Sequence, residues 1–337
     1  MRLENIISLT NAKLLNSPFV SSFEKLTFNV KKINRGDIFI AYNQYDIQQA
    51  IQNQAYAIIT DNENINIQKD DEIAWIKVDN LNDALFRLLR FRFIEKKISA
   101  YKCDELTLKL SYGIDTNKKV ISIKEDLKDM LDILWNLEEN TKLLFCPTLT
   151  DENLFIDAKN LPNIIKYHIQ IIEKTLFETS FIFDDKYYER ILLSPFFIPF
   201  LERLLNFYKT SNIKFKIRKF EYIDNFEIVF TNKNFEVKEL GSSDLVLIFE
   251  KDSKLLKKEI DFIQNMAPWA RLIYLLPDDE FYDDCKNCFY YKDISELFEV
   301  LKNEKFHFAL IGGVSKDVLL EYKSKKTSKQ LFFQNFI

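Results

Sequence analysis

The chain has 337 residues, 47% of them hydrophobic and 29% charged, which suits two or three globular domains and excludes a disordered chain. The 47 basic and 51 acidic residues nearly cancel, so charge gives no reason to expect nucleic acid or an anionic membrane as a partner. No run of about 18 apolar residues occurs and the start does not resemble a signal peptide, so we expect no membrane span and a cytoplasmic protein.

The first part of the chain predicts a strand–helix–strand unit. A short strand at 5–9 comes first. A turn at Gly36-Asp37 then leads into a buried strand at 38–41. A helix at about 46–54 and a second strand at 55–60 complete the unit.

A second strand–helix pair follows. Residues 73–78 form an apolar run typical of a strand, and residues 80–93 carry apolar side chains at helical spacing. Asn80 is a suitable N-cap for this helix because its side chain can accept a bond from a free backbone N–H group.

These motifs resemble the amino-terminal, UDP-sugar-binding domain of the Mur ligases of peptidoglycan synthesis. That family carries a Gly-Asp pair before a strand ending in Phe-x-Ala, an alanine-rich helix and strand, and a closing helix. Matching residues are Gly36, Asp37, Phe39, Ala41, Ala50, Ile51, Ala55, Ala57, Val78, Ala84 and Leu85. The resemblance therefore extends to residue 93 and predicts a Mur-ligase-like domain over 1–93.

The family's next feature, a phosphate-binding loop of the GKT or GKS type, has no counterpart here. Residues 99–114 occupy its place without a Gly-Lys pair, and no GKT or GKS occurs in the chain. Only five glycines are present, which leaves little material for a loop that turns its N–H groups toward an anion. We therefore predict no cofactor, no ATP binding and no catalytic residues, and a protein that is not a ligase.

The middle segment, residues 94–240, is shorter than the family's central domain and is predicted to be a reduced α/β domain. Strands are expected at 120–123, 143–146, 214–220 and 226–231, and helices at 125–137, 163–177 and 187–208, the last bent near Pro195 and Pro199.

Regular alternation begins at residue 243 and predicts a small doubly wound parallel sheet over 241–337. Strands are expected at 245–249, 271–276, 288–291 and 306–311, and helices at 253–264, 294–302 and 314–322. Position and rhythm resemble the family's carboxy-terminal domain, so the whole chain is predicted to be α/β with three segments in Mur-ligase order.

The candidate ligand-binding residues lie in the first and the last of the three predicted domains. The family's Asp-Ser-Arg falls on Asn29, Val30 and Lys31, where Lys31 keeps a positive charge that can meet a phosphate. Near the other end, Gly312, Gly313 and Ser315 lie at a strand-to-helix turn. The backbone N–H groups of this turn can bind an anion, although close packing of the turn explains the two glycines equally well.

Cysteine and histidine give no strong site. Cys285 and Cys288 form a lone CxxC, open to zinc or redox use but more typical of solvated cysteines in a turn. His168 and His307 lack partners at metal-ligand or triad spacing, so we expect structural histidines and no metal. Four cysteines fit a reducing compartment.

The carboxy-terminal residues are unusual because a chain end is commonly polar. Phe332, Phe333 and Phe336 are predicted to be buried, either on the last domain or in a partner. The leading function is thus a catalytically inactive, Mur-ligase-like protein that binds or scaffolds another protein, linked to cell-wall synthesis. The alternative is an enzyme or a binder of a UDP-sugar-like molecule that uses an interdomain cleft.

Overall fold

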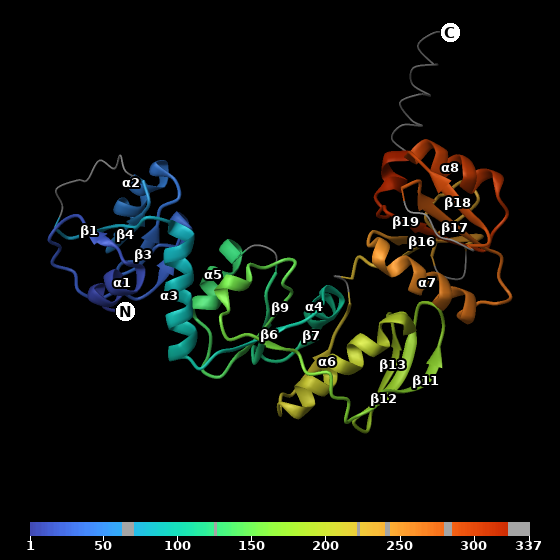
Figure 1. The fold of residues 1–337 in the computed structure, drawn as a ribbon, viewed down its shortest axis with the longest axis horizontal. Coiled ribbons are helices and arrows are strands. Elements are labelled where there is room, and N and C mark those ends of the chain that lie inside the picture. Colours follow the sequence, from blue (N-terminus) through green and yellow to red (C-terminus); the bar gives the residue numbers. More distant parts are fainter. Residues whose placement is uncertain (63–70, 125–126, 221–222, 240–242, 280–284, 323–337) are drawn as a thin grey trace, which may run out of the picture. The chain divides into compact units, whose positions relative to one another are not determined.

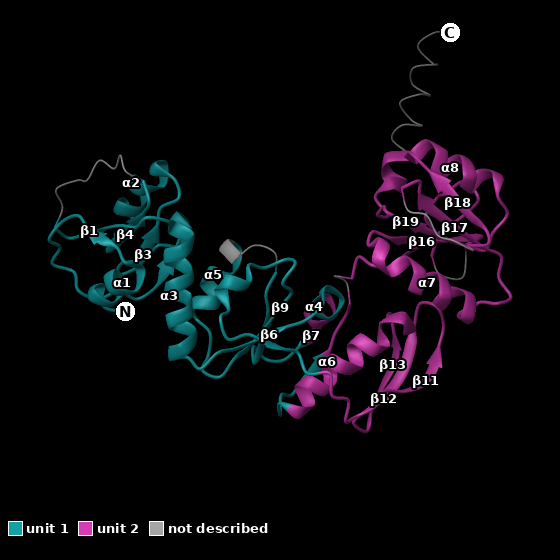
Figure 2. Ribbon diagram, in the orientation of Figure 1, with its two compact units in different colours: residues 1–108, 115–162, 211–216 teal, residues 109–114, 163–210, 217–337 magenta. Residues whose placement is uncertain are grey.

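The computed structural model describes residues 1–62, 71–124, 127–220, 223–239, 243–279 and 285–322. The chain forms two compact units (Figure 2). Unit 1 contains residues 1–108, 115–162 and 211–216; unit 2 contains residues 109–114, 163–210 and 217–337. The predicted middle segment thus contributes to both units.

The first sheet of unit 1 has five strands in the order β1-β5-β4-β3-β2. Figure 1 labels β1, β3 and β4 of this sheet. Strands β2 to β5 run parallel and β1 pairs antiparallel with β5. The elements are α1 (Leu3–Thr10), β1 (Lys13–Leu14), β2 (Leu26–Thr27), the 3-10 turn η1 (Val30–Lys32), β3 (Ile38–Ile40), α2 (Gln44–Gln52), β4 (Ala57–Thr60), β5 (Ala74–Lys77) and α3 (Leu81–Glu95).

The predicted strand–helix–strand unit and the capped helix are confirmed. All residues of β3 and β4 are buried, which explains their continuous apolar runs. The side chain of Asn80 accepts a bond from the backbone N–H of Asp83 at 3.0 Å and so begins α3. The strand expected at 5–9 is wrong: this segment belongs to α1, whose buried residues Leu3, Ile6 and Thr10 recur at helical spacing.

The second sheet of unit 1 has four parallel strands in the order β10-β6-β9-β8. Its elements are β6 (Ser99–Lys102), β8 (Val120–Ser122), α5 (Leu127–Trp135), β9 (Lys142–Phe145), the 3-10 turn η2 (Glu152–Leu154) and β10 (Lys159–Asn160). Three further elements, α4 (Glu105–Tyr112), β7 (Ile114–Asp115) and β14 (Lys216–Ile217), span positions where the chain passes from one unit to the other. The strands and helix expected between 120 and 146 are confirmed among the described residues.

A single apolar cluster joins the two sheets of unit 1. Leu85 and Phe93 of α3 belong to the same buried cluster as Leu134 and Trp135 of α5 and Phe145 of β9. The Phe93 ring also stacks on Phe155, with ring centroids 5.8 Å apart. Helix α3 is therefore covered on both sides by its own unit.

Unit 2 contains a three-stranded antiparallel sheet that the sequence did not predict. Its elements are β11 (Gln170–Lys174), β12 (Thr179–Phe183), β13 (Lys186–Ile191), the 3-10 turn η3 (Pro195–Phe197) and α6 (Ile198–Thr210). The helix expected at 163–177 is wrong, and the helix expected at 187–208 is correct only in its second part. A two-residue turn at Asp184-Asp185, where both φ angles are positive, joins β12 to β13 and fixes a hairpin.

The second sheet of unit 2 has the order β15-β16-β19-β17-β18, with β15 alone antiparallel. Its elements are β15 (Glu227–Thr231), β16 (Leu245–Glu250), α7 (Ser253–Met266), β17 (Leu272–Pro277), β18 (Cys288–Tyr291), α8 (Ile294–Asn303) and β19 (Phe308–Gly312). Residues 318–322 are helical.

Helices α7 and α8 lie on opposite sides of this sheet (Figure 1). Leu297 and Phe298 of α8 pack on Leu247, Phe249 and Ile311 of the strands. The predicted doubly wound parallel sheet is confirmed. Across the described residues, none of the helices has both the length and the apolar character needed to cross a lipid bilayer. The predicted tail residues Phe332, Phe333 and Phe336 lie outside the described residues.

Candidate functional site

The candidate residues of the first domain lie at η1, with Asn29 as its N-cap and Lys31 within it. The side-chain oxygen of Asn29 accepts a bond from the backbone N–H of Lys31 at 3.1 Å, so it caps this turn. Lys31 is exposed. The neighbouring Lys32 forms an ion pair with Asp132 at 2.9 Å. Asn29 thus has a structural contact, whereas the ammonium group of Lys31 forms no ion pair with a described residue.

The Gly36-Asp37 pair shapes the turn that precedes β3. Gly36 has a φ of +98°, a conformation that glycine adopts without strain. Asp37 is buried, and its Oδ2 accepts a bond from the backbone N–H of Asn34 at 2.9 Å. The Mur-ligase-like motif therefore has a local role in folding, because it fixes the path of the chain into the sheet.

The connection between β6 and α4 lies in the segment where the sequence resemblance would place the family's phosphate-binding loop. Only Cys103 and Asp104 separate the strand from the helix. Oδ1 of Asp104 accepts a bond from the backbone N–H of Thr107 at 2.8 Å, and its Oδ2 accepts one from the Thr107 hydroxyl, also at 2.8 Å. A carboxylate therefore lies at the helix amino terminus, where a phosphate-binding loop would direct N–H groups toward a phosphate.

Two buried cysteines lie at the carboxyl edge of the same sheet. Because Lys102 is in register with Phe145, the next residues, Cys103 and Cys146, follow at the ends of neighbouring parallel strands. Neither cysteine is part of a disulfide, and both are buried. The Cys103 thiol donates to the carbonyl of Phe145 at 3.6 Å. The Cys146 sulfur lies 3.1 Å from the Thr148 hydroxyl. Ligands commonly bind at this edge of an open parallel sheet, and here two buried cysteines lie there.

The glycine pair of unit 2 is explained by close packing. A Cβ at Gly312 would lie 2.5 Å from Leu256 Cδ1, and one at Gly313, whose φ is +81°, would lie 2.5 Å from Pro277 Cγ. The Gly313 N–H donates to the Glu250 carbonyl at 2.7 Å. Ser315 donates its hydroxyl proton to Asp317 at 3.1 Å.

Beside this turn lies a buried carboxyl pair that the sequence analysis missed. Glu250 and Glu259 are both fully buried. Glu250 accepts bonds from the Asn225 side chain at 2.8 Å and the backbone N–H of Phe226 at 3.0 Å, so its charge is stabilised. No donor among the described residues reaches either carboxyl oxygen of Glu259. Burial, together with the carboxylate of Glu250, raises the pKa of Glu259 to about 10.

Glu259 is consequently a neutral acid at pH 7, able to donate its proton toward Glu250. The signal for this pair was present in the sequence. Glu259 lies on the apolar face of α7 with Leu255, Leu256 and Ile263, where a carboxylate is not expected.

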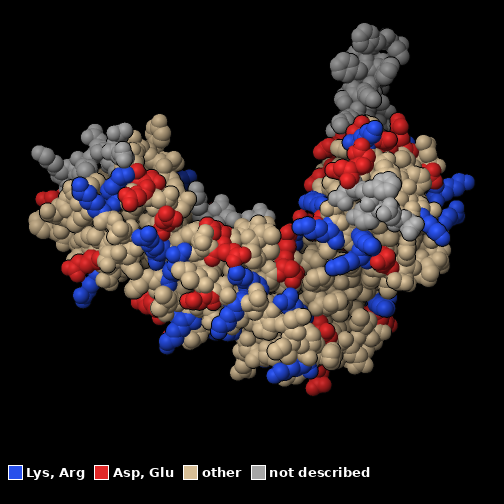
Figure 3. All heavy atoms as spheres, viewed as in Figure 1, with Lys and Arg blue, Asp and Glu red and all other residues tan. Residues whose placement is uncertain are grey.

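The other candidate residues, the CxxC cysteines and the two histidines, make contacts within the fold. Cys285 and Cys288 are joined as a disulfide, which corrects the expectation of two solvated cysteines. His307 accepts a bond at Nδ1 from the backbone N–H of Arg271 at 3.1 Å. Exposed His168 lies 3.5 Å from a carboxylate oxygen of Glu202. Basic and acidic side chains are interspersed on the face shown in Figure 3, in agreement with the balanced composition.

Comparison with known proteins identifies solved structures that share this architecture. No family model matches the sequence, and no curated protein matches it. Among solved structures, the MurF ligase of Thermotoga maritima, in complex with ADP, matches with a TM-score of 0.51 at 13% identity, over 91% of this chain and 98% of that chain. A MurF structure from Acinetobacter baumannii matches with a TM-score of 0.55 at 8% identity, over 96% of this chain and 98% of that chain.

A third structure, the UDP-N-acetylmuramoylalanyl-D-glutamyl-2,6-diaminopimelate–D-alanyl-D-alanyl ligase of Acinetobacter baumannii, gives a TM-score of 0.51 at 8% identity, over 97% and 98% of the two chains. The chain therefore has the multidomain α/β fold of the Mur ligases, and the predicted resemblance is confirmed at the level of fold. The MurF structures that share this fold are only 8% to 13% identical to this chain in sequence.

Proposed function

We propose that this protein is a Mur-ligase-like protein without ligase activity that binds or scaffolds another protein in the cytoplasm, in connection with cell-wall synthesis. The observation that carries the proposal is the position of Asp104. Its carboxylate caps α4 through Thr107, so a negative charge occupies the place where the family's loop would hold a phosphate. Repulsion between carboxylate and phosphate opposes nucleotide binding there.

The link to cell-wall synthesis rests on the fold shared with MurF ligases. The proposed partner-binding residues are Phe332, Phe333 and Phe336. Large aromatic side chains gain about 1.5–3 kcal/mol each when they leave water, which makes such a segment suited to docking on a protein.

Calorimetric titration with ATP and Mg²⁺ tests the first part of the proposal. We expect no binding, and the Thermotoga maritima MurF ligase, whose structure holds ADP, is the positive control. A dissociation constant tighter than roughly 0.1 mM, equivalent to about 5.5 kcal/mol, would overturn the proposal.

Affinity capture from the native cell tests the second part. The intact protein is compared with a variant in which Phe332, Phe333 and Phe336 are all alanine. We expect one partner to be retained by the intact protein and lost with the variant, and the purified partner to bind the intact protein directly. Equal capture by both proteins would remove the tail from the proposal.

A second candidate function is binding of a UDP-sugar-like molecule, and the exposed ammonium group of Lys31 favours it. Titration with UDP-N-acetylglucosamine, compared between the wild-type protein and Lys31→Ala, tests this alternative. Binding that Lys31→Ala weakens at least about tenfold would support it over the scaffold, because a phosphate contact of this kind is charge-assisted.

A further inference from the structure

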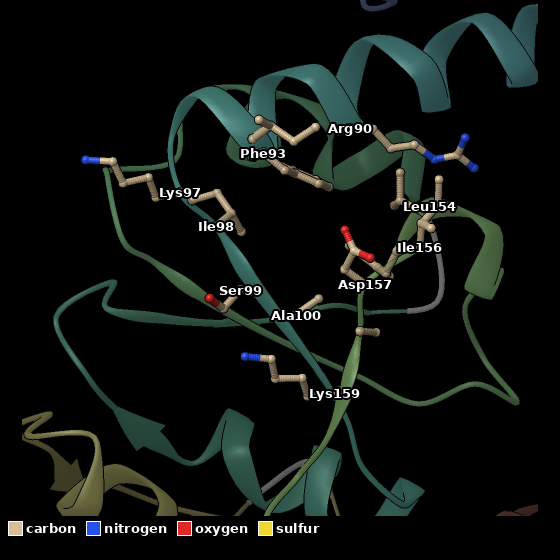
Figure 4. Close-up of a pocket in the computed structure, with 13 residues that line it drawn as sticks. Arg90, Phe93, Lys97, Ile98, Ser99, Ala100, Leu154, Ile156, Asp157 and Lys159 are labelled. Carbon is tan, nitrogen blue, oxygen red and sulfur yellow. The ribbon is translucent and has the colours of Figure 1, made fainter.

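A pocket of about 330 Å³ lies in unit 1, apart from the sheet edges described above. Helix α3, the start of β6 and the segment between η2 and β10 line it (Figure 4). It therefore lies near the beginning of β6, whereas the Cys103-Asp104 connection follows the end of that strand. Its volume is at the lower end of the range for small-molecule sites, which suits a ligand with few non-hydrogen atoms.

The pocket wall is mostly apolar. Phe93, Ile98, Ala100, Leu154 and Ile156 contribute to it. The Ile156 side chain is 73% exposed, although apolar side chains of this size are more often buried. An apolar group placed in the pocket would cover part of this surface and gain the free energy of its removal from water.

Two opposite charges lie at this apolar wall. In Figure 4 the carboxylate of Asp157 is directed toward Phe93, and the side chain of Lys159 lies near Ser99 and Ala100. Neither Asp157 nor Lys159 forms an ion pair with the other or with any other described residue. Both charges are thus available to a bound molecule.

The other two charged residues of the lining are directed elsewhere. Figure 4 shows the charged ends of Arg90 and Lys97 pointing away from the pocket. The Arg90 guanidinium donates to the carbonyl of Asn153, and Lys97 forms an ion pair with Glu139 at 2.6 Å. Among the charged groups of the lining, one carboxylate and one ammonium group are therefore left to face a bound molecule, and Ser99 adds a hydroxyl to the lining.

We propose that this pocket binds a small zwitterion with a compact apolar group. The ligand's ammonium group would pair with Asp157 and its carboxylate with Lys159, while the apolar group packs against Phe93, Ile98 and Ala100. A simple anion would meet repulsion from Asp157, and a simple cation would meet repulsion from Lys159. Only a ligand with both charges satisfies both residues, so charge complementarity selects it. This inference does not depend on the proposed function.

Isothermal titration calorimetry of the full chain with L-leucine tests the proposal. Isovaleric acid, which lacks the ammonium group, and isoamylamine, which lacks the carboxylate, are the matched ligands. We expect L-leucine to bind with a dissociation constant tighter than about 1 mM and both comparison ligands to bind at least about tenfold more weakly.

Variants identify the site. Asp157 and Lys159 are both exposed, so Asp157→Asn and Lys159→Gln should leave the melting temperature unchanged. Each substitution should weaken L-leucine binding at least about tenfold. Asp79→Asn and Lys25→Gln, equally exposed in the same unit but outside the pocket, are the controls and should bind L-leucine like the wild-type protein.

Three results would overturn the proposal. These are no heat of binding with L-leucine up to about 10 mM, equal binding of L-leucine and either singly charged ligand, and unchanged binding in both pocket variants.

Discussion

At the scale of single residues, Glu259 and Gly313 have unusual environments because of the neighbours that the fold brings next to them. Glu259 is a neutral acid because it is buried beside Glu250, whose carboxylate already accepts bonds from Asn225, Phe226 and Asp252. Gly313 is required because a positive φ coincides with a close approach to Pro277. Both residues were visible in the sequence, but their neighbours come from other elements and cannot be found from local pattern alone.

We predict that Glu259→Gln stabilises the protein at pH 7 by about 1–3 kcal/mol. The folded-state pKa is about 10, so Glu259 keeps its proton where the unfolded chain loses it above pH 4.5. The contribution of Glu259 to the free energy of unfolding therefore has its full value below pH 4.5 and decreases as the pH rises toward 10. Glutamine has the shape of the glutamate side chain and an N–H donor, but it does not have the cost of keeping a carboxyl group protonated.

Urea unfolding between pH 5 and pH 9 measures the effect. The free energy of unfolding of Glu259→Gln should fall less with pH than that of the wild-type protein. Glu299→Gln on the exposed face of α8 is the control and should change stability by less than about 0.5 kcal/mol. Identical pH profiles for wild-type and Glu259→Gln proteins would contradict the buried, protonated acid.

We also predict that Gly313→Ala destabilises the protein by about 1–3 kcal/mol, because the new Cβ is strained by the φ of +81° and meets Pro277 at 2.5 Å. Gly36→Ala is the matched comparison. Its φ of +98° is also positive, but the nearest atom to a new Cβ, Glu24 Cγ, is 3.5 Å away, so the loss should be smaller. Thermal unfolding ranks the two variants, and an equal loss would mean that packing at Gly313 adds nothing.

At the scale of elements, the sequence predicted strands and helices well where one face is buried. The apolar runs of β3, β16 and β19 and the spacing in α3 and α8 were sufficient. Apart from the strand expected at 5–9, which is part of α1, the failures fall in residues 163–191. All five residues of β11 are exposed, so its sequence shows no alternation of apolar and polar side chains. Its isoleucines, Ile171 and Ile172, lie seven positions after Ile164 and Ile165, which is a helical spacing.

The better signal in that segment was the Asp184-Asp185 dipeptide between two runs rich in β-branched and aromatic residues. Its φ angles of +53° and +58° are those of a type I′ hairpin turn, which favours Gly at the second position. We predict that Asp185→Gly stabilises the protein by about 0.5–1 kcal/mol, since glycine adopts this conformation without strain.

Urea unfolding measures this change against Asp151→Gly, where the φ of −59° is ordinary and the residue caps η2. That control should lose stability. If Asp185→Gly also lost stability, the hairpin turn would not have the geometry assigned to it.

At the scale of the whole molecule, the order of elements was predictable and the grouping of segments was not. Similarity to the Mur ligase fold was evident from the first motif and the last sheet. The proposed divisions 1–93, 94–240 and 241–337 follow the order of the chain, whereas packing joins segments that the chain separates. The cluster that contains Phe93 and Trp135 is a contact between two of these segments, and no local pattern in either one reveals it.

This shared cluster predicts that residues 1–93 and the sheet formed by β6, β8 and β9 unfold together. Arg92 of α3 donates from Nε to the carbonyl of Trp135 at 3.1 Å, and its guanidinium lies 5.6 Å from the Trp135 ring. Separating the two parts would expose Phe93, Trp135 and Phe155 to water, each at a cost of about 1.5–3 kcal/mol. One cooperative transition is therefore expected for Trp75 and Trp135, which are both buried.

Fluorine NMR of the full chain, with its three tryptophans labelled, follows each site through urea unfolding without altering the core. Tryptophan-to-phenylalanine variants are used only to assign the three resonances. The resonances of Trp75 and Trp135 should change with the same midpoint, while Trp269, which is 72% exposed and belongs to unit 2, reports separately on that unit. Distinct midpoints for Trp75 and Trp135 would show that the first segment folds as a domain of its own, and that the cluster around Phe93 contributes too little to couple it to α5.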